Sequence, residues 1–152
     1  METLIQSTPP SGFTGMFLTA SKTGWNLEAR SEPALISIVE DDAPVLKSLA
    51  RLIRTAGYRV RTFGSAEEFL ESGRDEEVAC IILDLQLPGM SGLDLQARLV
   101  AQGYPAPVVF VTAHTELETR TQALQGGAVA FLGKPFSEDA LLDAIRSGIE
   151  RR

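Results

Sequence analysis

Short apolar runs alternate with amphipathic segments from residue 34 to the end of the chain. The runs are residues 34–39, 58–63, 78–83, 106–111 and 128–132. Most of them are continuously apolar rather than alternating, which is typical of strands covered on both faces in a parallel sheet. The run at 58–63 also carries Arg59 and Arg61, so it is predicted to be an edge strand.

The segments between the runs have the apolar spacing of helices. The predicted helices are residues 45–56, 65–73, 93–101, 116–125 and 137–150. Pro44 suits the first turn of the first helix and Gly57 marks its end. Ser65 and Glu68 have capping-box spacing at the start of the second. Five strand–helix alternations predict an α/β fold, a doubly wound (βα)5 parallel sheet with right-handed crossovers.

The first 33 residues lack this pattern. They are rich in Ser, Thr, Gly and Pro, and their hydrophobic residues have neither helical nor alternating spacing. We therefore expect residues 1–33 to be a flexible tail and residues 34–152 to be one globular domain. Two interpretations of the tail stay open: an extended translation start, or a partner-docking segment around GFTGMFL at residues 12–18.

Composition narrows the classes of function. The chain has 152 residues, 44% of them hydrophobic, and a net charge of -6. The negative charge argues against direct nucleic-acid binding, which depends on clustered Lys and Arg. No apolar run reaches the roughly 18 residues of a membrane span, and Glu2 stands where an export signal carries positive charge. The single Cys80 lies in an apolar run and is expected to be buried. Because one cysteine cannot form a disulfide within the chain, a reducing, cytoplasmic location is predicted.

Candidate site residues, most of them polar, follow four of the predicted strands. They are Glu40, Asp41 and Asp42 after the first, Asp84 after the third, Thr112 and Ala113 after the fourth, and Lys134 and Pro135 after the fifth. Ligands of doubly wound sheets bind at the carboxyl ends of the strands. We therefore expect these residues to share one rim of the sheet.

Several carboxylates on one rim repel one another unless a cation lies between them. The candidate ligands are all oxygens, without a His or Cys pair, which favours Mg²⁺ over zinc. Bound Mg²⁺ usually keeps waters and takes a phosphate oxygen, so the site is predicted to perform phosphoryl chemistry.

Each residue then has a predicted role. Asp84 is the nucleophile at a rigid strand end. Asp41 and Asp42 hold the metal, directly or through water, and the backbone carbonyl of Gln86 adds an oxygen. Lys134 supplies positive charge, and Thr112 a hydroxyl, to phosphoryl oxygens.

The motifs VEDD, DLQLPGMSG, VTAH and FLGKPF follow one another within residues 34–152. In their order and spacing they resemble the receiver domain of two-component response regulators. The resemblance implies a flavodoxin-like fold with strand order 2-1-3-4-5. It also implies that Asp84 accepts a phosphoryl group from a histidine kinase or phosphotransfer protein. Thr112 and Lys134 would be switch residues and Phe131 the aromatic switch.

The resemblance further implies a cis bond between Lys134 and Pro135, and that Gln86 and His114 occupy variable positions that tune the lifetime of the phosphoryl group. The first helix would be the kinase-docking surface. Signals would pass to a downstream protein through the face formed by residues 116–125, 128–132 and 137–150, with a possible dimer through the same face. Such a protein is a signalling switch and not an enzyme beyond its own phosphorylation and dephosphorylation.

Alternative interpretations stay open. Because the chain stops after the last predicted helix, we expect a single-domain regulator; the rival is the amino-terminal part of a longer DNA-binding transcription regulator. A Mg²⁺-dependent phosphohydrolase of the haloacid dehalogenase type is disfavoured, because it would need a second Asp where Gln86 stands. Among single residues, Asp41 or Asp42 could cap the first helix, and His114 is expected to be a surface loop residue.

Overall fold

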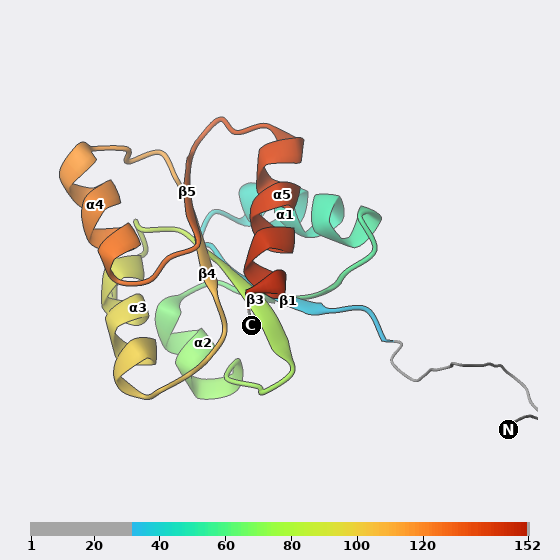
Figure 1. Ribbon diagram of the computed structural model, residues 1–152, viewed down its shortest axis with the longest axis horizontal. Coiled ribbons are helices and arrows are strands. Elements are labelled where there is room, and N and C mark those ends of the chain that lie inside the picture. Colours follow the sequence, from blue (N-terminus) through green and yellow to red (C-terminus); the bar gives the residue numbers. More distant parts are fainter. Residues whose placement is uncertain (1–31, 152) are drawn as a thin grey trace, which may run out of the picture. The chain divides into compact units, whose positions relative to one another are not determined.

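A computed structural model describes residues 32–151 of the chain, and residues 34–152 form one compact unit. The predicted tail lies almost entirely outside the described residues and stays a prediction. Figure 1 shows the elements, which are β1 Leu35–Val39, α1 Ala43–Thr55, β2 Arg59–Phe63, α2 Ala66–Ser72, β3 Val78–Leu83, α3 Gly92–Ala101, β4 Val108–Thr112, α4 Leu117–Gln125, β5 Ala130–Gly133 and α5 Glu138–Glu150.

The five strands form one parallel sheet in the order β2-β1-β3-β4-β5. Helices α1 and α5 cover one face, and α2, α3 and α4 cover the other (Figure 1). Both the doubly wound fold and the edge position of β2 are therefore confirmed. The order reverses between β1 and β3, and in such sheets this is the point where ligands bind.

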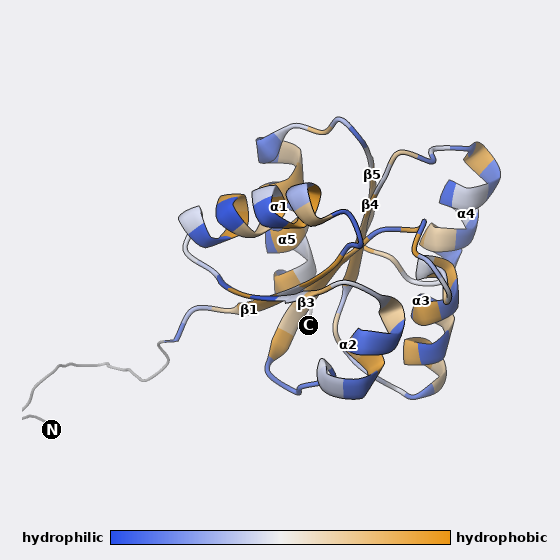
Figure 2. Ribbon diagram, turned by 180° about the vertical axis from the view of Figure 1, so that it is seen from behind, coloured by the Kyte–Doolittle hydropathy of each residue, from blue (hydrophilic) through white to orange (hydrophobic). Residues whose placement is uncertain are grey.

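Apolar side chains pack in two layers, one on each face of the sheet. Alternate residues of β1 and β3 enter different layers: Ile36 and Ile82 face α1 and α5, whereas Val39 and Leu83 face α2 and α3. This two-sided burial explains the continuous apolar runs. Cys80 is buried, as predicted. Figure 2 shows hydrophobic and hydrophilic residues alternating along the helices, as expected of amphipathic helices.

Four helices begin at a side-chain cap. Asp42, Ser65, Ser91 and Ser137 each accept a backbone N–H from the first turn of α1, α2, α3 and α5, respectively. At α2, Ser65 accepts the N–H of Glu68 at 3.0 Å, while the Glu68 carboxylate accepts the N–H of Gly64 at 2.9 Å. In a capping box the Glu68 carboxylate would accept the N–H of Ser65; here it accepts the N–H of the preceding residue, Gly64.

Two strands begin later than the apolar runs suggested. β4 begins at Val108 rather than residue 106, because Pro107 has no N–H to donate to a neighbouring strand. β5 begins at Ala130 rather than residue 128, because the N–H of Ala128 bonds to the carbonyl of Ala123 and still belongs to the turn after α4. Among the described helices, none has the length and apolar character needed to cross a membrane.

Candidate functional site

Two buried carboxylates lie at the carboxyl ends of the central strands. Glu40 follows β1 and is 2% exposed, and Asp84 follows β3 and is 7% exposed. The N–H of Asp84 donates to the carbonyl of Val39 at 3.2 Å, so hydrogen bonding between the strands continues to the site itself. The position of the Asp84 carboxylate is thus fixed by the most rigid part of the sheet.

Lys134, which follows β5, bridges these two carboxylates. Its Nζ donates to Oε1 of Glu40 at 2.8 Å and to Oδ2 of Asp84 at 3.2 Å. The other oxygen of Asp84 accepts the backbone N–H of Gln86 at 3.1 Å. Both oxygens of the buried Asp84 side chain therefore have a hydrogen-bond donor.

The electrostatics of the site follow from this burial. Burial raises the pKa of Glu40, and the charge of Asp84 raises it further, while the hydrogen bond from Lys134 acts in the opposite direction. Burial acts to lower the pKa of Lys134, but the hydrogen bond to Glu40 and the charge of Asp84 outweigh it, so the pKa lies above its usual value. Lys134 therefore stays protonated, and one cation faces two buried carboxylates.

A third carboxylate completes an oxygen cluster. One oxygen each from Glu40, Asp41 and Asp84 lie within 4.8 Å of one another. Three acidic oxygens at this separation, with a single lysine for compensation, match the donor set that Mg²⁺ prefers. The cluster therefore fits the predicted metal ion by its chemistry.

Asp42 does not belong to this cluster. Its Oδ1 accepts the N–H of Val45 at 3.3 Å and caps α1. Its own N–H donates to Oε2 of Glu40 at 3.2 Å. The three acidic oxygens that lie together here therefore come from Glu40, Asp41 and Asp84, whereas the metal-binding role predicted for Asp42 remains a prediction. The cap signal was present in the sequence, since Pro44 two positions later marks a first turn.

The loop after Asp84 is held close to the strand by Gly92. A Cβ at this position would lie 2.3 Å from the carbonyl oxygen of Asp84, so only glycine lets α3 begin here. Gly89 has a φ of +77°, and the carboxylate of Glu67 accepts the N–H of the next residue, Met90, at 2.8 Å. The loop is therefore fixed both by backbone packing and by α2.

The remaining predicted residues surround this centre. Thr112 is fully buried at the end of β4, and its Oγ1 accepts the N–H of His114 at 3.1 Å. Ala113 and His114 are exposed, as is Gln86. These positions agree with a loop role for His114. The Lys134-Pro135 bond is cis, as the resemblance implied.

Phe131 is buried on β5, 4% exposed, with its ring centroid 6.2 Å from that of Phe110. The guanidinium of Arg120 on α4 lies over the ring, 5.8 Å from its centroid. No feature of the sequence pattern singled out Arg120, because an exposed arginine on a helix is ordinary. The contact of Arg120 with Phe131 follows from the packing of α4 on β5, which the sequence pattern does not give.

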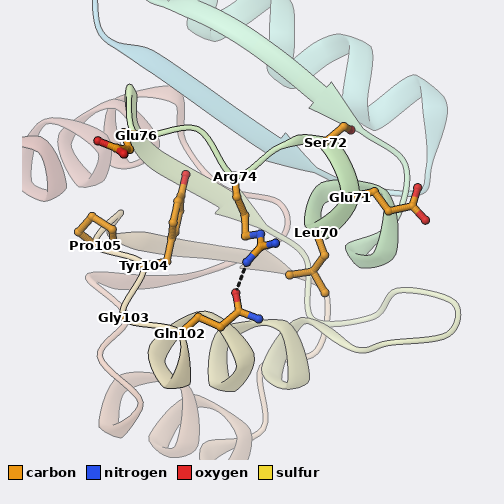
Figure 3. A pocket seen from close by; sticks show the side chains of 9 residues that line it. All are labelled: Leu70, Glu71, Ser72, Arg74, Glu76, Gln102, Gly103, Tyr104 and Pro105. Atoms are coloured by element: carbon orange, nitrogen blue, oxygen red, sulfur yellow. Dashed lines mark hydrogen bonds between the residues drawn. The ribbon is translucent and has the colours of Figure 1, made fainter.

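A cavity of about 600 Å³ lies away from these residues. It is formed by the end of α2 and the loop that follows α3. Figure 3 shows Arg74 reaching across it to the side chain of Gln102. The hydroxyl of Tyr104 donates to the carbonyl of Asp75 at 2.7 Å. These contacts join neighbouring elements at the amino ends of the strands, so the cavity is not part of the carboxylate site.

Comparison with known proteins agrees with this geometry. The sequence pattern of the response regulator receiver domain matches residues 36–146. Nodulation protein W of Bradyrhizobium diazoefficiens is 42% identical over 128 residues, which are 84% of this chain and 56% of that protein. Transcriptional regulatory protein FixJ of the same organism is 35% identical over 116 residues, which are 76% of this chain and 57% of FixJ.

Among solved structures, response regulator StyR has a TM-score of 0.72 to this chain at 43% identity. The match covers 80% of this chain and 61% of that one. The chain spans little more than half the length of the curated relatives it matches. The similarity therefore covers most of this chain and only one part of each relative.

Proposed function

The chain belongs to the family of response regulator receiver domains, and from that premise we propose that it is a phosphorylation-dependent switch whose phosphoacceptor is Asp84. The observation that carries the proposal is the bridge from Lys134 to Asp84 and Glu40 at the carboxyl end of β3. Such a bridge places a positive charge beside the carboxylate oxygen that would attack phosphorus. The proposed donor is a histidine kinase or a phosphotransfer protein.

In the proposed reaction an oxygen of Asp84 attacks the phosphorus of a phosphohistidine. The phosphorus–nitrogen bond breaks, its electron pair leaves with the imidazole, which takes up a proton, and an acyl phosphate remains on Asp84. Lys134 then binds a phosphoryl oxygen with its charge, and Thr112 donates its hydroxyl to another. These residues stabilise the charge that the transfer develops, which is the main catalytic requirement of phosphoryl transfer.

Glu40, Asp41 and Asp84 would hold Mg²⁺, with the carbonyl of Gln86 as a further predicted ligand. The ion would supply charge compensation for the phosphoryl oxygens beside these carboxylates. Asp42 is left out of the proposed ligand set because it caps α1.

The proposed output is contact with a downstream protein through α4, β5 and α5, by a shift between two states rather than by turnover of a substrate. The same face is the proposed site of a dimer, and α1 that of kinase docking. We include a cytoplasmic location in the proposal, with which the buried free thiol of Cys80 is compatible.

The central prediction is tested by incubating the protein with acetyl phosphate and Mg²⁺. We expect one phosphoryl group per chain, measured by intact mass, and no labelling of Asp84→Asn. The matched control is Asp94→Asn, an exposed carboxylate on α3 that should label normally. Labelling of Asp84→Asn at the level of the unsubstituted protein would refute the proposed phosphoacceptor.

The metal site is tested by comparing neighbouring acidic residues. We expect Asp41→Asn to weaken Mg²⁺ binding at least about tenfold, since even outer partners of metal ligands contribute that much. Asp42→Asn should retain binding, because asparagine also caps helices. Binding is measured by Mg²⁺ titration of backbone amide NMR shifts. Equal weakening by the two substitutions would contradict the assignment.

A second candidate is a receiver within a longer transcription regulator. It is favoured by one observation: the matched part is 57% of a relative that is named a transcriptional regulatory protein. Sequencing the reading frame beyond residue 152 separates the candidates. A helix-turn-helix in frame would favour the longer regulator, and a stop codon would favour the single-domain form.

A further inference from the structure

Helix α4 is held by less apolar burial than the helices around it. Its only fully buried residue is Ala123, whereas α1 buries three residues and α5 buries four. Glu116, at the N-cap, makes no side-chain capping hydrogen bond. Leu117 is 78% exposed and Leu124 is 40% exposed. Since burial is the main source of helix stability in proteins, something else must position α4.

Two polar side chains from different directions attach α4 to the domain. The buried Nε2 of Gln96 on α3 donates to the carbonyl of Ala123 at 2.9 Å. A Cβ on Gly126 would lie 2.7 Å from Oε1 of Gln96, so the amide fits tightly against the end of α4. Arg120 makes the second attachment: its Nη1 donates to the carbonyl of Phe131 at 3.4 Å, beneath the stacked guanidinium.

The two attachments differ in how easily they can be broken. Gln96 is buried, so breaking its bond would leave its own side-chain N–H group without this partner in an apolar layer, whereas the carbonyl of Ala123 would keep the N–H of Ala128. Arg120 is exposed, so water replaces its partners at little cost. One of the two contacts of Arg120, the one over the face of the Phe131 ring, depends on the position of that ring; the other goes to the backbone carbonyl of the same residue.

We infer that Arg120 is a positioning residue that ties the first half of α4 to Phe131, while Gln96 fixes the second half as a pivot. A movement of the Phe131 ring removes the ring contact of Arg120 and leaves it only the 3.4 Å bond to the Phe131 carbonyl, which loosens the beginning of α4 while the end of the helix stays in place. The attachment itself is independent of the proposed function. Its use as a switch rests on that function, since the phosphoryl group is what would move Thr112 and Phe131.

The attachment is tested by amide hydrogen exchange of the full, unphosphorylated chain. We expect Arg120→Gln to raise exchange at residues 120–122 by about two- to five-fold, and to leave residues 123–125 and α1 unchanged. Gln96→Leu should raise exchange throughout α4 by about tenfold. The matched control is Arg146→Gln, which removes an exposed arginine paired only within α5.

Unchanged exchange at residues 120–122 in Arg120→Gln would overturn the inference. So would a rise that is equal throughout the domain, or an equal rise at residues 120–122 in Arg146→Gln. Arg120→Lys, which keeps the charge without the planar group, should lie between the unsubstituted protein and Arg120→Gln. A rise in Arg120→Lys larger than in Arg120→Gln would also count against the stacked guanidinium.

The switch is tested with beryllofluoride and Mg²⁺ as a phosphoryl analogue. We expect loading to raise exchange at residues 120–122 in the unsubstituted protein, and to change it less than half as much in Arg120→Gln, where this segment is already released. An equal change in both proteins would overturn the coupling through Arg120. No change in any residue of the unsubstituted protein would instead refute the proposed function, and the exchange of the unloaded variants would still decide the attachment.

Discussion

Two serines differ in whether their hydroxyl groups have a hydrogen-bond partner. Ser37, in the middle of β1, is fully buried, and its hydroxyl has no hydrogen-bond partner among the described residues. Ser65 accepts a backbone N–H at the start of α2. A buried hydroxyl without a partner costs free energy, whereas a capping hydroxyl stabilises the helix that it begins.

We therefore predict opposite effects of the same substitution. Ser37→Ala should raise the free energy of unfolding by about 1 kcal/mol, and Ser65→Ala should lower it by about 1 kcal/mol. Urea unfolding followed by far-ultraviolet circular dichroism measures both. A loss of stability in Ser37→Ala would mean that the hydroxyl has a partner in solution.

Some residues of the candidate site could be predicted from the sequence, and others could not. Spacing placed Asp84, Thr112 and Lys134 at the ends of strands, and the structure brings Lys134 to Asp84 at 3.2 Å. The spacing of residues in the sequence did not decide which acidic residues of the VEDD motif face Asp84. A change of one position turns a side chain by roughly 100° at the start of a helix, so neighbouring acidic residues point in different directions: Asp41 joins the acidic cluster, whereas Asp42 caps α1.

At the scale of elements, α2 and the loop before α3 are joined by one carboxylate. Glu67 is exposed, and the hydrogen bond from the N–H of Met90 lowers its pKa below the usual 4.5. A lowered pKa in the folded state means that ionised Glu67 stabilises the fold. This contribution is present above the unfolded-state pKa and is lost as the pH falls through the folded-state value.

We therefore predict that Glu67→Gln destabilises the domain at pH 7 and that the difference from the unsubstituted protein shrinks below about pH 4.5. Urea unfolding of both proteins between pH 3 and 7 measures the difference. Glu71→Gln on the same helix is the control, since no loop contact depends on it. A difference that stays constant across this range would show that Glu67 does not act through its charge.

The bounds of a strand were predicted best where the strand is buried on both faces. The runs that became β1 and β3 are buried on both faces, and their bounds were close to those predicted. The starts of β4 and β5 were displaced by hydrogen-bonding limits at Pro107 and Ala128 that hydrophobicity does not register. The attachment of α4 was not predictable, because Gln96 and Arg120 are ordinary helix residues until their partners are known.

At the scale of the whole molecule, both apolar layers and every candidate site residue lie within residues 34–152. We predict that a protein with residues 1–33 deleted unfolds cooperatively, with a midpoint within a few degrees of the full chain. Differential scanning calorimetry measures this. Loss of the cooperative transition would show that the first 33 residues contribute to the fold.

The bridge made by Lys134 joins residues that are far apart in the chain, since Glu40 is 94 positions away and Asp84 is 50. During synthesis the acidic residues leave the ribosome long before the lysine that neutralises them. The lysine can pair with these carboxylates only after the last strand has been synthesised. A nascent or truncated chain without β5 would therefore lack this compensating charge, and the proposed transfer to Asp84 would have to wait for residue 134.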